Sequence, residues 1–146
     1  RVIEYMPPHL TLAMSENNAN VKSFTATGSR AMFRAATGCR GVSCDLMVLE
    51  EPAFWRPYCD EIWKSLLPVI AHEGRCVAFS TTNGVGGWFY DTYSDAQVGA
   101  NQFAVFDVDY REHPEYNDPK WVAQMREQLG EAGFLQEIEG HFVTKA

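Results

Sequence analysis

Two adjacent carboxylates follow a short apolar run near the middle of the chain. The run is Leu46–Leu49, and the acids are Glu50 and Glu51. A short apolar run bounded by turn signals is typical of a strand buried on both faces, as in a parallel sheet. Parallel strands direct their carboxyl ends at the ligand crevice, so one carboxylate can hold Mg²⁺ through water and the next can activate a water for phosphoryl transfer. This is a Walker B arrangement, although a strand that runs into an acidic surface loop has the same pattern.

Small polar side chains follow the next predicted strand. They are Ser80, Thr81, Thr82 and Asn83. Hydroxyl and amide groups at this place could sense a terminal phosphate by hydrogen bonding, or could simply form a turn. Two adjacent parallel strands would bring Glu50, Glu51, Thr82 and Asn83 to the same edge of the sheet.

An arginine lies on a glycine-containing loop before the acidic strand. Arg40, followed by Gly41, could stabilise charge that develops on a phosphate, as an arginine finger does, or could be an exposed surface residue. The sequence contains no G-x-x-x-x-G-K-[ST] motif, and no lysine follows a glycine. We therefore expect that this chain cannot bind ATP phosphates tightly by itself.

The elements that would position these side chains alternate between strands and helices. The pattern predicts a hairpin over 21–35, strands at Asp45–Leu49, Arg75–Ser80 and Phe103–Val108, and helices after Pro57, around Trp88–Tyr93 and after Asp118. This order favours the α/β class with a largely parallel sheet.

The composition is that of a folded, acidic domain. The chain has 146 residues, of which 46% are hydrophobic and 13% aromatic, and its net charge is −7. The apolar content argues against disorder, and the charge argues against a basic nucleic-acid clamp. Four cysteines without C-x-x-C spacing and the lack of a long apolar run predict a reduced, intracellular protein with no membrane span.

Taken together, these motifs resemble the large subunit of the tailed-bacteriophage terminase, a DNA-packaging motor. The resemblance covers about Val21 to Phe142. Residues 29–41 resemble the family's glycine-serine hairpin and Arg-Gly loop, 46–54 (L-M-V-L-E-E-P-A-F) its Walker B segment, and 80–84 its coupling motif, followed by Phe89-Tyr90. His113-Pro114, Trp121 and 134–137 resemble the end of its ATPase domain.

The resemblance implies part of a P-loop NTPase fold of the RecA/ASCE type, a mostly parallel sheet flanked by helices with a small helical lid. Residues 1–109 would form the second half of the ATPase core, and 110–146 the lid that leads to a nuclease domain. Glu50 would take the metal-side position, where the family usually has Asp, and Glu51 would be the catalytic carboxylate. Arg40 would reach a neighbouring subunit's nucleotide, and residues 80–83 would couple hydrolysis to DNA movement.

The resemblance also implies ATP and Mg²⁺ as ligands. The partners would be double-stranded DNA, the portal protein, the terminase small subunit and other copies in a homo-oligomeric ring, in the host cell cytoplasm. The phosphate-binding loop would lie upstream of Arg1 and the nuclease downstream of Ala146, so we expect no ATP hydrolysis by this chain alone.

Two other classes of function are open. A metal-dependent nuclease could use an acidic cluster after the predicted third strand, which otherwise is a solvated strand end. These acids are Asp107, Asp109 and Glu112. A non-catalytic assembly module could present exposed aromatic residues, which otherwise fill the core. These are Trp55, Tyr58 and Trp88.

Overall fold

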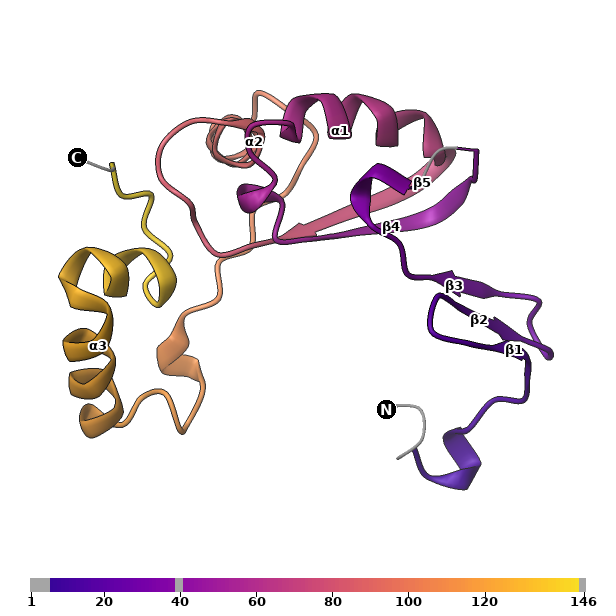
Figure 1. Ribbon diagram of the computed structural model, residues 1–146, viewed down its shortest axis with the longest axis horizontal. Coiled ribbons are helices and arrows are strands. Elements are labelled where there is room, and N and C mark those ends of the chain that lie inside the picture. Colours follow the sequence, from indigo (N-terminus) through magenta and orange to yellow (C-terminus); the bar gives the residue numbers. More distant parts are fainter. Residues whose placement is uncertain (1–5, 39–40, 145–146) are drawn as a thin grey trace. The chain divides into compact units, whose positions relative to one another are not determined.

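The chain folds as two compact units, residues 1–40 and 41–146, in a computed structural model (Figure 1). The structure describes residues 6–38 and 41–144. The domain boundary predicted after residue 109 falls inside the second unit.

The first unit is a three-stranded antiparallel sheet in the order β1-β2-β3. Its elements are η2 (Pro8–Leu10), β1 (Met14–Asn17), β2 (Val21–Phe24), β3 (Arg30–Met32) and η3 (Ala36–Gly38). The predicted hairpin over 21–35 is confirmed, with Val21 opposite Met32. Its turn uses Gly28, whose φ of 66° suits a residue without a Cβ, and the Gly28 N–H donates to the Phe24 carbonyl at 2.9 Å.

The polar run before this hairpin contributes a strand that the sequence did not reveal. Residues 1–20 predict a short helix or loop followed by a turn, and η2 and the turn at Asn18 agree with this, but Met14–Asn17 also pairs with β2 as a strand. The turn itself is formed by Asn18, whose side-chain oxygen accepts the N–H groups of Asn20 and Val21 at 2.9 and 2.8 Å. Polar residues hid the strand because its side chains are largely exposed and carry no clear apolar alternation.

The second unit holds a mixed α/β arrangement around a small parallel sheet of two strands. In chain order its elements are β4 (Cys44–Glu50), η4 (Pro52–Phe54), α1 (Cys59–Leu66), η5 (Leu67–Val69), β5 (Ile70–Phe79), α2 (Trp88–Gln97), η6 (Tyr110–Glu112) and α3 (Pro119–Glu137). Helix α3 bends at Gly130, which has φ 68° and ψ 169°.

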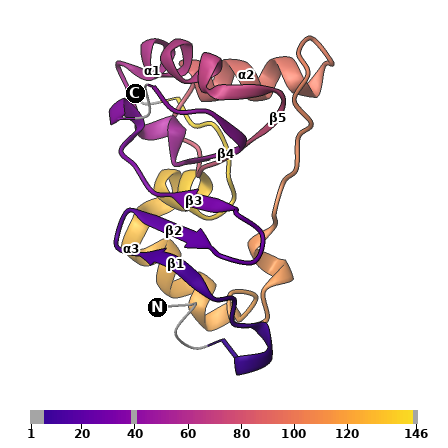
Figure 2. The same ribbon diagram turned by 90° about the vertical axis from the view of Figure 1, so that its right-hand side faces the viewer.

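Strands β4 and β5 pair in parallel, as predicted, with Met47 opposite Cys76 and Val48 opposite Val77. Helices α1 and α2 lie on the same side of this sheet in two perpendicular views (Figures 1 and 2). Met47 and Leu49 on that side are 7% and 4% exposed. Because successive strand residues point to opposite faces, the other face of the sheet carries the alternate side chains.

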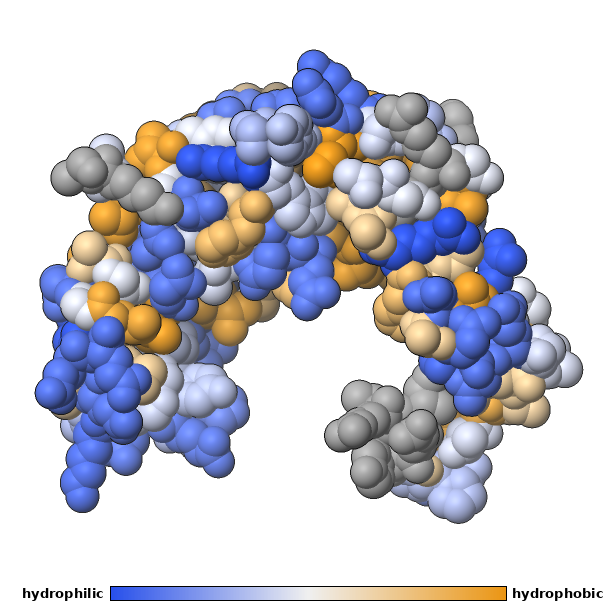
Figure 3. All heavy atoms as spheres, in the orientation of Figure 1, coloured by the Kyte–Doolittle hydropathy of each residue, from blue (hydrophilic) through white to orange (hydrophobic). Residues whose placement is uncertain are grey.

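The other face of the sheet is open within the described residues. Leu46 and Val48 are 56% and 55% exposed, and Val77 and Phe79 are 50% and 48% exposed. Orange side chains are visible below β4 and β5 in Figure 3. The expectation that the apolar run is buried on both faces is therefore wrong for this part of the chain, because both covering helices pack on one side.

The predicted third strand at Phe103–Val108 is not formed. These residues have no regular secondary structure and run as an open segment between α2 and η6 (Figure 2). A strand needs a neighbour within hydrogen-bonding distance, and here a cavity of about 680 Å³ is bordered by this segment and by Ala78 and Phe79 of β5. Apolar alternation alone did not reveal that separation.

Aromatic side chains make up much of the core of the second unit. Trp88 is 7% exposed, and its ring centroid lies 4.7 Å from that of Trp63 and 6.4 Å from that of Phe103. Trp88 therefore fills the core, as one of the two interpretations of this residue held. Among the described residues, no helix is both long and apolar enough to cross a membrane.

Candidate active site at the carboxyl edge of the parallel strands

Glu51 lies directly after β4, at the carboxyl edge of the parallel pair. Its N–H donates to the Phe79 carbonyl at 2.9 Å, which continues the pairing of the strands by one residue. Its Oε2 atom accepts the Ser80 hydroxyl at 2.9 Å and the Thr81 N–H at 3.1 Å. The carboxylate is thus fixed by the loop that follows the neighbouring strand.

The backbone of Glu51 has a left-handed conformation, with φ 51° and ψ 44°. Among the described residues it is the one non-glycine residue with positive φ. This conformation costs an ordinary L-residue about 1–2 kcal/mol, and such strain concentrates at functional sites. It turns the chain sharply from β4 into η4, so that the side chain is directed at Ser80 and Thr81 rather than along the strand.

Glu50 differs from its neighbour in every one of these respects. It is the last residue of β4, lies opposite Phe79 in the register and is exposed on the open face. Among the described residues, its carboxylate forms no hydrogen bond or ion pair. Its oxygens are therefore available to a ligand from solvent.

The four polar residues after β5, of which Thr82 and Asn83 were predicted to share this edge with the acids, have different partners. Ser80 and Thr81 contact Glu51 as described, and the Ser80 hydroxyl also accepts the Ala53 N–H at 3.3 Å. Asn83 donates from Nδ2 to the Ala53 carbonyl at 3.1 Å. This bond and the Ser80 contact hold η4 against the loop after β5.

Thr82 faces the C-terminal segment instead of the acids. It is 5% exposed, and its hydroxyl oxygen lies 2.6 Å from the His141 carbonyl oxygen and 3.1 Å from that of Gln136. The Thr81 hydroxyl donates to the Glu137 carboxylate at 3.3 Å. The same short loop therefore contacts Glu51 on one side and the end of α3 on the other.

The C-terminal partners of this loop were not predicted from the sequence. Residues 134–137 were assigned to the end of an ATPase domain, but the contacts of Glu137 and His141 with the threonines were not predicted, because these partners lie more than fifty residues apart in the chain. Phe142 was missed for the same reason, although its ring centroid is 4.9 Å from that of Tyr90 in α2. The available signal was the set of apolar residues Phe134, Leu135, Ile138 and Phe142.

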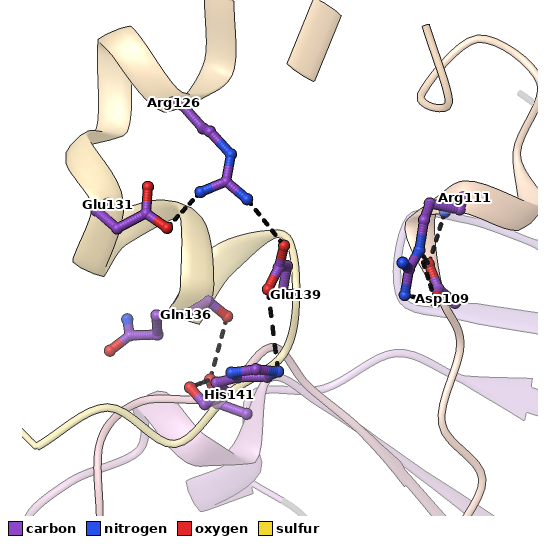
Figure 4. A network of polar contacts seen from close by, with 8 residues as sticks. Asp109, Arg111, Arg126, Glu131, Gln136, Glu139 and His141 are labelled. Atoms are coloured by element: carbon purple, nitrogen blue, oxygen red, sulfur yellow. Dashed lines mark hydrogen bonds and ion pairs between the residues drawn. The ribbon is translucent and has the colours of Figure 1, made fainter. Parts of the chain in front are cut away.

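An ionic cluster stabilises the end of α3 (Figure 4). The Arg126 guanidinium pairs with Glu131 and, at 3.1 Å, with Glu139, and its Cζ atom lies 4.0 Å from the centroid of the Phe134 ring. Phe134 is fully buried. The hydrogen bond to Glu131 raises the pKa of Arg126, which keeps the guanidinium charged. This cluster holds residues 138–142 beside the loop that carries Thr82.

Two of the three acids of the nuclease hypothesis, Asp107 and Asp109, have local partners. Asp109 accepts hydrogen bonds from the Arg111 guanidinium, which hold its pKa at about 2, and it also caps η6. Asp107 lies within 3.1 Å of the Tyr93 hydroxyl. Within residues 6–38 and 41–144, no group of three or more His, Cys, Asp or Glu side chains is arranged to hold a metal ion. The geometry adds no support to that hypothesis.

The aromatic residues proposed for an interface are not equivalent. Trp88 is buried, Trp55 is partly exposed and Tyr58 is 61% exposed. Arg40 lies outside the described residues, so its predicted role has no structural description here.

Comparison with known proteins gave no further assignment. No protein-family model matches this chain, and no curated protein matches it.

Proposed function

We propose that this chain is part of the ATPase domain of a viral DNA-packaging motor of the terminase large-subunit type. The observation that carries the proposal is the position of Glu51, a strained acid at the carboxyl edge of two parallel strands, fixed by Ser80 and Thr81. In open α/β sheets, ligands bind at this edge. The proposal includes the fold: a partial P-loop NTPase of the RecA/ASCE type with a small lid.

Glu51 and Glu50 have separate roles in this proposal. One Glu51 oxygen is held by two donors, which would position the carboxylate to orient an attacking water and accept its proton. Glu50 is suited to Mg²⁺, since Mg²⁺ binds through one or two carboxylates and retains several waters. When bound, Mg²⁺ supplies neutralisation of the charge on the phosphates.

The contacts of the loop after β5 support a coupling role. Thr81 contacts both Glu51 and Glu137, and Thr82 bonds to the main chain near His141. A change in the position of Glu51 during hydrolysis would shift this loop and with it the end of α3. Ser80 and Asn83 hold the other side of the loop to η4.

The ligands and partners of the proposal follow from the resemblance. They are ATP and Mg²⁺, double-stranded DNA, the portal protein and the terminase small subunit, in a homo-oligomeric ring in the host cytoplasm. Arg40 would act on the nucleotide of a neighbouring subunit.

The test combines the coding sequence on both sides of this segment with hydrolysis of Mg-ATP by a protein that includes it. We expect a G-x-x-x-x-G-K-[ST] loop upstream and no hydrolysis by the 146-residue chain alone. In the longer protein, Glu51→Gln should lower kcat by about 10²–10⁴-fold, the usual contribution of a general base.

The matched control is Glu61→Gln, an exposed acid in α1 that should leave kcat unchanged. Full activity of Glu51→Gln, or flanking sequence without a phosphate-binding loop, would contradict the proposal.

A second candidate is a non-catalytic assembly module, and the open face of the sheet favours it. Four apolar side chains there are about half exposed, a pattern typical of interaction surfaces. This function predicts a sedimentation coefficient that rises with protein concentration and no longer does so in Val48→Lys. A concentration-independent monomer would exclude it.

A further inference from the structure

Charge is distributed unevenly between the two units of the chain. Residues 1–40 contain five of the 12 Lys and Arg residues but only two of the 19 acids. The stretch 17–44 contains no Asp or Glu at all. Its four cations are Lys22, Arg30, Arg34 and Arg40. The net charge of −7 therefore conceals a basic segment in an otherwise acidic chain, and a local cluster of cations attracts polyanions.

The cations of this segment that the structure describes lie on or directly after the β2–β3 hairpin (Figure 2). Lys22 is in β2, and Arg30 begins β3 opposite Ser23. Arg34 follows the strand by two residues. Both arginines are exposed, as are all the residues of the turn before Arg30. The hairpin therefore presents its cations to solvent.

These three cations form no ion pair with any described residue. Lys22 donates to the side-chain oxygen of Asn17, and the Arg34 guanidinium donates to the Gly38 carbonyl at 3.2 Å. Both of these acceptors are neutral. Since no carboxylate offsets their charge, the three side chains remain available to an anion from solution.

The two units differ clearly in this respect. The first unit has one described acid, Glu16 in β1, and its carboxylate accepts the Ser23 hydroxyl at 3.3 Å. In the second unit, the guanidinium groups of Arg111 and Arg126 both pair with carboxylates. The hairpin is thus a basic surface without internal neutralisation, whereas cations of the second unit are used within the fold.

The other side chains of the hairpin turn suit a phosphate backbone. Thr25, Thr27 and Ser29 are exposed and carry hydroxyl groups. Arg, Lys, Ser and Thr side chains are among the usual donors to the phosphate oxygens of DNA. A two-stranded antiparallel ribbon also fits the major groove of a duplex. The combination of unpaired cations, exposed hydroxyls and a ribbon favours duplex nucleic acid over an acidic protein surface.

We propose that the β2–β3 hairpin binds the phosphate backbone of double-stranded DNA through Lys22, Arg30 and Arg34. The inference rests on the proposed function for the choice of DNA as the nucleic acid, and it adds the surface that DNA contacts. It uses neither Glu50 nor Glu51, so DNA contact and ATP hydrolysis can be tested separately.

The experiment measures binding of the 146-residue chain to a fluorescently labelled DNA duplex by fluorescence anisotropy. A duplex of about 20 base pairs is titrated at salt concentrations from about 50 to 200 mM. Three contacting cations predict a slope of about −2.7 for the logarithm of the binding constant against that of the salt concentration, which weakens binding about 40-fold over this range.

Charge-removing variants locate the contact. Arg30→Gln and Arg34→Gln should each make the slope less steep by about 0.9 and weaken binding about tenfold at the lowest salt concentration. The matched control is Lys64→Gln, which removes an exposed cation without a described ion pair from α1 of the second unit. It lowers the net charge equally and should leave the slope unchanged. Circular dichroism establishes that the variants fold.

Three results would overturn the proposal. The first is the absence of DNA binding by the folded chain at the lowest salt concentration. The second is the same salt slope in Arg30→Gln, Arg34→Gln and Lys64→Gln, which would place the contact elsewhere. The third is salt-sensitive self-association without DNA that is lost in Arg30→Gln, which would show that an acidic surface of a second copy occupies the hairpin.

The outcomes also distinguish this inference from the proposed function. If DNA binding fails while Glu51→Gln abolishes ATP hydrolysis in the longer protein, only the hairpin surface is rejected. If the chain binds DNA as expected but the flanking sequence has no phosphate-binding loop, the ATPase proposal is rejected and the hairpin surface stands.

Discussion

The two faces of the β4–β5 sheet have nearly the same kind of residues and opposite surroundings. Met47 and Leu49 are buried under the helices, whereas Leu46 and Val48, one residue away in each case, are more than half exposed. The difference is not in hydrophobicity, because all four side chains are apolar. Apolar residues in a strand therefore favour burial, but the neighbouring elements decide which face of the strand is covered.

The two acids that end β4 extend this comparison. Glu50 continues the open face, and the left-handed backbone of Glu51 turns its carboxylate to the loop after β5. Glu50, on the open face, is therefore exposed to solvent, whereas Glu51, after the turn, is hydrogen-bonded to protein donors. The following five predictions test this difference between covered and exposed parts of the molecule.

The largest effect should come from shortening a side chain on the covered face of the sheet. Leu49→Ala leaves a cavity under the helices and should lower the free energy of unfolding by about 2–4 kcal/mol. Leu46→Ala is the matched control from the open face of the same strand and should cost less than about 1 kcal/mol. Urea denaturation of both variants measures the difference. Equal losses in the free energy of unfolding would show that the two faces of the strand are equally covered.

The next largest effect should be the slow alkylation of the two cysteine thiols in the covered region. Burial raises the pKa of the Cys59 and Cys76 thiols to about 11. At pH 8 their thiolate fractions, and hence their alkylation rates, should be about 100-fold below those of an unperturbed thiol. Iodoacetamide labelling followed by mass spectrometry measures this, with the urea-unfolded chain as the control.

The same thiols give stability a pH dependence. The folded pKa lies above the unfolded one, so the unfolded chain loses its protons first as pH rises. The stabilisation that the buried, protonated thiols give to the folded chain is fully present below about pH 9 and is lost progressively up to about pH 11.

In the labelling experiment, rapid reaction of Cys76 in the folded chain at pH 8 would show that this side of the sheet is open as well.

Removing the Thr82 hydroxyl should have a smaller effect. Thr82→Val keeps the shape of the side chain and leaves the His141 carbonyl without this donor, which should cost about 1–2 kcal/mol. Thr92→Val in α2 is a control, since Thr92 accepts the Asn101 side-chain N–H through its main-chain carbonyl. Hydrogen exchange should also become faster at residues 138–142. Unchanged exchange there would show that the Thr82 hydroxyl does not hold the C-terminal segment.

The smallest effect should come from the backbone at Glu51. Glu51→Ala and Glu51→Gly both remove the bonds to Ser80 and Thr81, but only glycine relieves the positive φ. The glycine variant should therefore be the more stable of the two by about 1 kcal/mol. Thermal denaturation compares them, and a more stable alanine variant would show that residue 51 does not have this conformation in solution.

The sequence by itself determined the elements whose signals are local. The apolar run before Glu50, the Gly28 turn and the aromatic spacing at Trp88 each specify their own structure through steric limits, side-chain periodicity or burial. These signals predicted two adjacent parallel strands, with Glu51 at the edge where the loop after the second strand begins.

Only the tertiary structure decided what depends on distant residues. It left 103–108 unpaired across a cavity, covered one face of the sheet and turned Thr82 toward His141 instead of the acids. A strand exists only when its backbone groups find partners, and a hydroxyl bonds to whichever carbonyl the fold brings within reach. Neither condition can be evaluated from the residues on one stretch of chain.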